Sequence, residues 1–272
     1  MSQFRIRSLI LAGAAAMVLA ACNGGRGSAT PETPFTAKAA KGAIANAACS
    51  VTSFNGAISY GTANSNADGL ISFNLVGELP EDAALLVTCA PTASATYFNE
   101  ATGATLSLPA SISAVISSQA IASGTAELAV TPLTNLAAQQ LRAASVAAGG
   151  AQPNALAATN ANIIIAQAFG LSSITALPPT VNGSTTSISN PYALVLASIA
   201  EAAAASGQNP FAFVSALIGA SPDAIDTAQA AIAAGVAEIA SKFTVPADVV
   251  TATQNAVENA STDTAVPLLS GT

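Results

Sequence analysis

The spacing of apolar residues changes once along this 272-residue chain, near residue 130. Before that point, apolar and polar residues alternate and turn residues interrupt the pattern, which is typical of strands that bury one face. After it, apolar residues recur at helical spacing. The sequence therefore predicts an α+β fold in two segments. An N-terminal antiparallel β-sandwich over 37–130 precedes an Ala-rich helical bundle over 131–262, and a tail follows over 263–272.

The helical part carries its own start and stop signals. Four pairs place a capping side chain directly before a proline suited to the first helical turn: Thr131-Pro132, Asn190-Pro191, Asn209-Pro210 and Ser221-Pro222. Glycines at 149, 170, 207 and 219 mark helix ends. These signals predict helices near 132–147, 154–169, 191–206, 210–218, 222–241 and 246–260. The stretch 171–190 between two of them is long for a connection, and we interpret it as a mobile surface loop or as a loop that contacts a partner.

In the N-terminal part, turn residues separate the expected strands. The strands are predicted at 42–45, 48–54, 57–62, 70–75, 84–89, 95–98, 104–108, 112–116 and 126–130. Asn55-Gly56 is typical of a tight hairpin. The segment 64–69 has the oxygen spacing of a calcium loop, but Leu75 stands where a bidentate Glu is needed. We therefore interpret this segment as a turn, and the sequence predicts neither a metal site nor a cofactor site.

The first 21 residues have the layout of a signal peptide. Arg5 and Arg7 precede an apolar run from Leu9 to Ala21. A helix of that length rises less than the roughly 30 Å of a hydrocarbon core. The run predicts export from the cytoplasm and not a membrane span.

The end of this run, Leu19-Ala20-Ala21-Cys22, resembles the lipobox of bacterial lipoproteins. The resemblance implies cleavage before Cys22, lipidation of Cys22 and attachment to a membrane through its acyl chains. Asn23, in place of Asp, favours the outer membrane, in either leaflet. The alternative is an ordinary signal peptide followed by a Cys. Residues 22–36, rich in Gly, Ser, Thr and Pro, are predicted to form a flexible tether.

Two stretches of the β-part, 41–47 and 66–73, resemble the carboxypeptidase-regulatory-like and bacterial Ig-like modules. In those modules a G-x-I-x-x-A-x-V run precedes an Asp-Gly turn and a core strand, as Gly42 and Asp68-Gly69 do here. Such modules are mostly accessory or adhesive, so the resemblance implies a fold and no catalytic site. The run Thr131 to Ala137 resembles a junction of envelope proteins in which a β-module passes directly into helices.

Two cysteines lie on inward faces of predicted strands. Cys49 alternates with Val51, and Cys89 alternates with Val87. In an oxidising compartment this placement predicts a Cys49–Cys89 disulfide, and the alternative is two buried thiols. A catalytic thiol is disfavoured because the chain has no His to activate it.

The charged residues exclude several classes of function. With no His, imidazole catalysis and His-containing metal sites are excluded. Removal of residues 1–21 takes Arg5 and Arg7 from the 7 basic residues, which leaves 5 against 14 acidic residues and a formal charge of −9. The remaining bases are scattered, so we expect no nucleic-acid partner. Nucleophile-elbow, phosphate-loop and dinucleotide motifs are missing from the sequence.

These observations favour a non-enzymatic, lipid-anchored envelope protein that binds, adheres or scaffolds at the outer membrane or cell surface. Its partner would be an envelope protein or a polysaccharide, and its oligomeric state is left open. One alternative is a glycan hydrolase that uses paired carboxylates, from the clusters Glu78, Glu81 and Asp82 or Asp223 and Asp226. A third hypothesis is a carrier of an apolar small molecule or lipid in a cavity between the helices.

Overall fold

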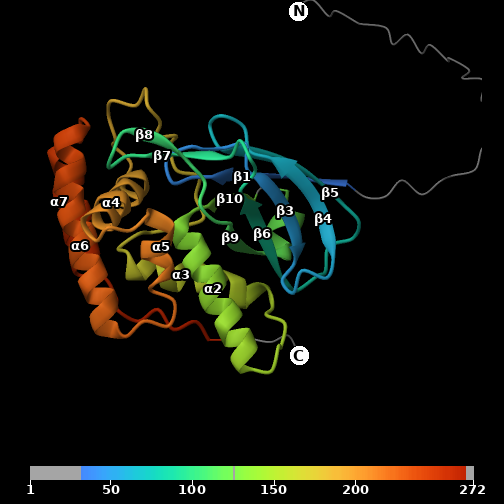
Figure 1. Cartoon of the computed structure of the whole chain (residues 1–272). Helices are drawn as coiled ribbons and strands as arrows, with labels where there is room; N and C mark the ends of the chain where they lie inside the picture. The colour runs from blue at the N-terminus through green and yellow to red at the C-terminus, as the bar shows by residue number, and fades with distance from the viewer. Residues whose placement is uncertain (1–31, 125, 268–272) are drawn as a thin grey trace, which may run out of the picture. The chain divides into compact units, whose positions relative to one another are not determined.

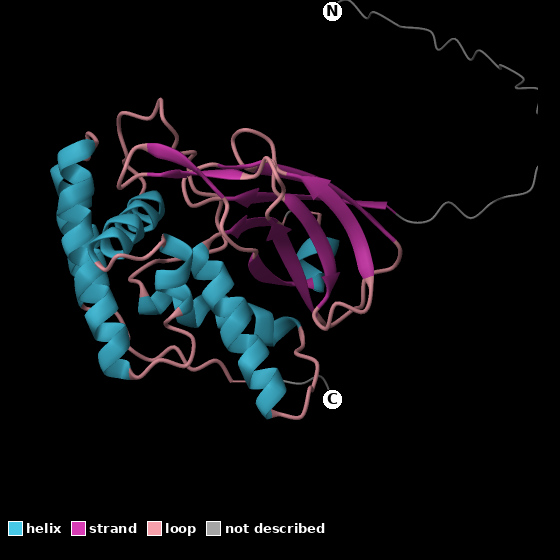
Figure 2. Ribbon diagram, in the orientation of Figure 1, coloured by secondary structure: helices cyan, strands magenta, loops and turns pink. Residues whose placement is uncertain are grey.

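The computed structural model of the chain describes residues 32–124 and 126–267, which have a mixed α+β fold. Strands form the N-terminal part and helices the C-terminal part (Figure 1). The signal peptide, Cys22 and most of the predicted tether lie outside the described residues. Figure 2 shows the helices gathered on one side of the strands, apart from the short helix α1.

The element bounds follow the predicted order closely. The strands are β1 Glu32–Ala39, β2 Ile44–Ala45, β3 Ala48–Ser53, β4 Ser59–Asn64, β5 Leu70–Val76, β6 Ala84–Ala90, β7 Thr96–Asn99, β8 Ala104–Ser107, β9 Ile112–Ser117 and β10 Glu127–Val130. The helices are α1 Ser118–Ala122, α2 Pro132–Ala147, α3 Ala155–Ala168, α4 Pro191–Ala205, α5 Pro210–Ser215, α6 Pro222–Lys242 and α7 Ala247–Glu258. Strand β1 and helix α1 were not predicted from the sequence.

The strands pair in three sheets, with the orders β4-β3-β6-β9, β10-β1-β5 and β2-β7-β8. Strand β1 pairs antiparallel with β5 but parallel with β10, so the prediction of a purely antiparallel β-part was wrong for this pair. A parallel pair needs a long connection between its strands, and here the rest of the β-part provides it.

Strand β1 begins at Glu32 and takes in residues 32–36 of the predicted tether. The reason is a ring contact: Phe35 is buried and stacks on Phe73 of β5, with ring centroids 5.8 Å apart. The composition of this stretch predicts a tether, but its one large apolar side chain, Phe35, is buried by the sheet.

Strands β6 and β9 lie in a sheet that is covered on both faces. Leu85 and Val87 belong to a core shared with β1 and β5, whereas Leu86 and Val115 belong to a core shared with α2, α3 and α4. Four consecutive residues of β6, from Ala84 to Val87, are therefore buried. Strand β5, in contrast, alternates buried and exposed residues because only one of its faces is covered. The helices thus pack directly on the central sheet.

The chain passes from β10 into α2 without a loop. Thr131 caps α2: its Oγ1 accepts from the Thr134 amide, and Thr134 Oγ1 accepts from the Thr131 amide. The Tyr192 hydroxyl of α4 contacts Thr131 Oγ1 at 2.7 Å and donates to the Ile174 carbonyl at 2.8 Å. Burial raises the pKa of Tyr192 far above its usual range, although the hydrogen bond to Thr131 opposes this. All the polar groups named here are buried, so this junction is part of the core.

Strand β9 is an edge strand, and side chains from two helices bind its free edge. Asn135 Oδ1 of α2 accepts from the Ser113 amide at 2.9 Å. Asn162 Nδ2 of α3 donates to the Val115 carbonyl at 2.9 Å. Unpaired backbone groups at a sheet edge otherwise invite pairing with another chain. The two asparagines satisfy these groups and fix both helices against the sheet.

The turn at 64–69 confirms a local interpretation of the sequence. In the segment 64–69, Asn66 Oδ1 accepts from the amides of Asp68 and Leu70, as in a turn. Gly69 has φ +79°, and a Cβ there would lie 2.1 Å from the Ala39 carbonyl oxygen. Only glycine fits this position, which joins the turn closely to β1.

We predict that Asn135→Ala lowers the free energy of unfolding by about 1–3 kcal/mol, because the buried Ser113 amide loses its acceptor. Urea denaturation measures this loss, and hydrogen exchange at the Ser113 amide should accelerate. Gln139→Ala, on the same helix, is the control and should change stability by less than about 0.5 kcal/mol. Equal effects of the two substitutions would contradict the role given to Asn135.

Candidate functional site

Residues 171–190, which connect α3 to α4, form the segment that we call the strap. Its backbone is bound at three places to β1, β10 and the turn after β1: the Thr175 carbonyl accepts from the Ala129 amide, the Val181 carbonyl accepts from the Ala43 amide, and the Pro178 carbonyl accepts from Lys38 Nζ. Each of these distances is 2.8 Å. The strap is therefore held against β1 and β10, unlike a mobile surface loop.

Lys38, near the C-terminal end of β1, is the side chain that binds the strap. It is 9% exposed and donates to the Pro178 carbonyl and to Thr180 Oγ1 at 2.7 Å. Burial lowers the pKa of Lys38, and the charge of Asp68 partly opposes this effect. Neutral oxygens satisfy the ammonium group, so Lys38 serves the packing of the strap on the sheet.

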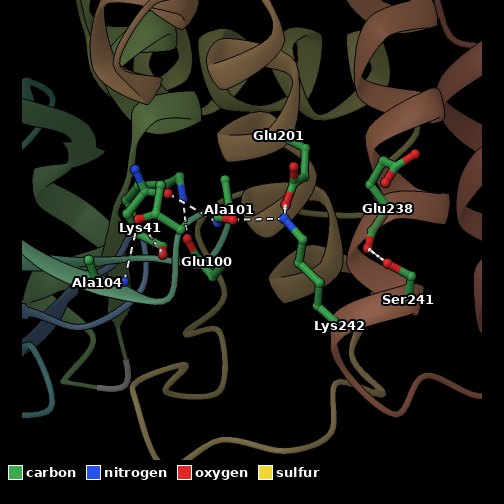
Figure 3. Close-up of polar contacts among 10 residues, drawn as sticks. Lys41, Glu100, Ala101, Ala104, Glu201, Glu238, Ser241 and Lys242 are labelled. Atoms are coloured by element: carbon green, nitrogen blue, oxygen red, sulfur yellow. Dashed lines mark hydrogen bonds and ion pairs between the residues drawn. The ribbon is translucent and has the colours of Figure 1, made fainter.

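A buried ion pair lies close to the strap. Lys41 is 0% exposed and pairs with Glu100, which is 2% exposed (Figure 3). Glu100 Oε2 accepts a hydrogen bond from the Lys41 ammonium group. Glu100 Oε1 is buried and has no hydrogen-bond partner in the described part of the chain. Removing both charges from water is costly, and their mutual attraction offsets the cost only while both are present. No local pattern indicates this pair, because its members lie 59 residues apart.

A second lysine approaches the same turn from the helical side. Lys242, the last residue of α6, donates to the Ala101 carbonyl at 2.7 Å and pairs with Glu201 of α4 (Figure 3). The turn after β7 is thus bound by Lys41 from the strands and by Lys242 from the helices. These contacts join the strands and the helices at a second place, besides the β9 edge.

A cavity of about 220 Å³ lies under one end of the strap. Its walls come from β9, β10, α3 and strap residues 172–175, and they are mainly apolar, with Ile116, Leu128 and Ile174 among them. Asn162 also lies in the wall. Both Nδ2 protons of Asn162 go to carbonyls, which fixes the orientation of its amide, and Oδ1 is left without a partner. The cavity is large enough for a small apolar molecule.

The structure does not bring the candidate carboxylates together. Asp82 Oδ1 accepts from the Ala155 amide at 2.9 Å and so caps α3, while Glu78 and Glu81 are exposed. Asp223 and Asp226 are both exposed on α6, and Asp223 lies in the first turn, where the helix dipole favours negative charge. Neither cluster lines the cavity under the strap. Within residues 32–124 and 126–267, no group of three or more acidic or Cys side chains is placed to hold a metal ion.

The predicted disulfide is present. Cys49 of β3 and Cys89 of β6 are bonded, and they face each other directly in the antiparallel register. Both are buried in the core between the sheets. The crosslink closes a loop of 40 residues and constrains the unfolded chain.

Comparison of the chain with protein-family models, with curated proteins and with solved structures gives no match. Among the helices that the structure describes, none has the length and apolar character needed to cross a membrane.

We predict that Lys41→Met and Glu100→Gln each lower the free energy of unfolding by about 3–5 kcal/mol, because each leaves an uncompensated buried partner. The double variant should recover most of this loss. Lys242→Met is the comparison: Lys242 is 39% exposed and Glu201 13%, so water reaches this pair and the cost should be clearly smaller than that of either change at the buried pair. Urea denaturation of all four variants tests the coupling, and strictly additive losses would contradict it.

Proposed function

We propose that the protein is a non-enzymatic lipoprotein of the bacterial cell envelope. It is anchored through Cys22, at the outer membrane or cell surface, and it binds or scaffolds an envelope protein or a polysaccharide. The β-part acts as a sandwich-like module, and the Ala-rich helices form a bundle packed on it.

The observation that carries the proposal is the Cys49–Cys89 disulfide. Disulfides form and persist in oxidising compartments such as the periplasm and the cell surface. This supports the export signal that Arg5, Arg7 and the run ending at Cys22 encode in the sequence. Three acyl chains on Cys22 would hold the chain on a membrane.

A binding or scaffolding role is also supported by how the polar interior is used. Lys38, Lys41 and Asn135 each make contacts that fix one part of the fold on another. A rigid body that joins strands and helices in this way presents its surfaces in a constant arrangement. That is what an anchored binding protein requires.

We predict that the mature protein begins at Cys22 and carries acyl chains, which intact-mass measurement will show directly. Cys22→Ala should abolish the added mass and release the chain from the detergent phase on partitioning. The double variant Cys49→Ala/Cys89→Ala is the control, since it removes the crosslink but should keep the lipid. Unchanged partitioning of the Cys22→Ala variant would contradict the anchor.

A second candidate function, a carrier of an apolar small molecule, is favoured by the cavity under the strap. The walls of the cavity are mainly apolar, and its volume of about 220 Å³ is of the order that a small ligand needs. The half-buried Ala126 lies in this wall, so a larger side chain there would fill the space.

If the protein is a carrier, native mass spectrometry of the full chain should show a retained small molecule. Ala126→Leu should abolish retention by filling the cavity. Ala231→Leu, in the wall of a different groove between α4, α5 and α6, should leave it unchanged. A spectrum of unliganded protein alone would remove the carrier hypothesis while leaving the lipid anchor untouched.

A further inference from the structure

The positive charges of the folded part are few, and all but one are engaged. Of the 7 basic residues, Arg5, Arg7 and Arg26 fall outside the described residues. Lys38 and Lys41 are buried and bonded, and Lys242 is paired with Glu201. Arg142 is exposed, and it has no hydrogen-bond or ion-pair partner among the residues that the structure describes. It is therefore the single free cation of the described chain, on a strongly acidic protein.

Arg142 stands in the wall of a cleft of about 460 Å³. The cleft lies between the turn that joins β3 to β4 and the C-terminal end of α2. Its lining consists of Phe54, Asn55, Gly56, Leu86, Arg142, Ser145, Gly150 and Gln152. This lining contains no carboxylate, although the chain has 14 acidic residues. An anion in the cleft would meet one guanidinium and no adjoining negative group of the lining.

Two side-chain amides in the cleft are only partly used by the fold. Asn55 Oδ1 accepts from the Ala57 amide at 3.1 Å and from Ser53 Oγ at 2.8 Å, which leaves its Nδ2 as a free donor. Gln152 Nε2 donates to the Gly150 carbonyl at 3.2 Å, which leaves its Oε1 as a free acceptor. The cleft thus offers one cation, one neutral donor and one neutral acceptor around the largely buried side chains of Phe54 and Leu86.

We infer that this cleft binds a sugar that carries a carboxylate, such as a uronate unit of an acidic polysaccharide. The inference names a site and a ligand class for the proposed binding function and rests on it. The planar guanidinium of Arg142 matches a carboxylate with two parallel hydrogen bonds. The amides of Asn55 and Gln152 bind hydroxyl groups of the ring, and Leu86 contacts its apolar face.

The charge balance selects a carboxylate in preference to a phosphate. One guanidinium neutralises one negative charge, so a monoanion leaves the site neutral. A phosphate monoester carries about −1.5 to −2 charges at neutral pH and would leave an excess on an acidic protein. The site is accordingly specific for the monoanion.

The helix dipole does not account for Arg142, because the residue lies before the last turn of α2 and the dipole acts within that turn. A role of its charge alone is tested by Arg142→Lys. Lysine keeps the positive charge but lacks the planar fork, so a charge-only role predicts no change, whereas carboxylate recognition predicts weaker binding.

The test is titration of the full chain, in a sugar-free non-ionic detergent, with glucuronate, glucose and glucose 6-phosphate, followed by ligand-observed NMR. Glucuronate should bind saturably with a dissociation constant of about millimolar order, and the two other probes more weakly. Arg142→Gln should weaken glucuronate binding at least about tenfold, and Arg142→Lys by a smaller factor. Asn55→Asp keeps the acceptor of the turn but places a carboxylate at the site, so it should abolish binding.

Val146→Ala, an exposed position on the same helix, is the matched control and should bind glucuronate as the parent chain does. The inference is overturned if glucuronate does not saturate, if Arg142→Gln binds it unchanged, or if glucose 6-phosphate binds more tightly. Because the probes are soluble, the result is independent of the anchor. Failure here with normal acylation of Cys22 would reject the site and leave the envelope lipoprotein standing.

Discussion

The free edge of β9 is the constraint on which the arrangement of helices and strands depends. A sheet edge inside a protein must have its amides and carbonyls satisfied, because a buried unpaired backbone group costs about 1–3 kcal/mol. Here Asn135 of α2 accepts from the Ser113 amide of this edge, and Asn162 of α3 donates to the Val115 carbonyl. A helix that supplies a hydrogen bond at a fixed residue cannot slide along the sheet. The asparagines therefore set the register of α2 and α3, while the apolar core around Leu86 and Val115 provides most of the attraction.

Local signals made the helical part predictable from the sequence. A capping side chain before a proline acts within one turn of its helix, so it needs no knowledge of the rest of the fold. Asn190 and Ser221 begin α4 and α6 as their sequence context predicts, and each side chain accepts from the third residue after it. The disulfide was predictable for a similar reason. Alternation along each strand pointed Cys49 and Cys89 inward, and the sheet places them opposite each other.

The features that the sequence did not reveal depend on partners far along the chain. The parallel pairing of β1 with β10 joins residues about 90 positions apart, and no local pattern encodes it. The same holds for Lys41. The residues around it are typical of an exposed turn, and only the folded chain places Glu100 beside it. The strap was interpreted as a loop because Ser, Thr and Pro dominate it. The strap is held in place by Lys38 and by backbone groups of the β-part. Lys38 lies 140 residues before Pro178, to which it donates.

The placement of the lysines bears on what the surface can recognise. Lys38 and Lys41 lie inside the protein and Lys242 is paired, so the positive charges serve to hold the strap and the turn after β7. The exposed surface is left acidic, which weakens the approach of anions everywhere except where a cation is free. Such a surface selects by repulsion as well as by attraction: negative charge is disfavoured over most of it, and a carboxylate, such as that of one uronate unit, meets a positive group only near Arg142. Because Lys38 and Lys41 are buried and Lys242 is paired with Glu201, Arg142 is the free positive group among the described residues.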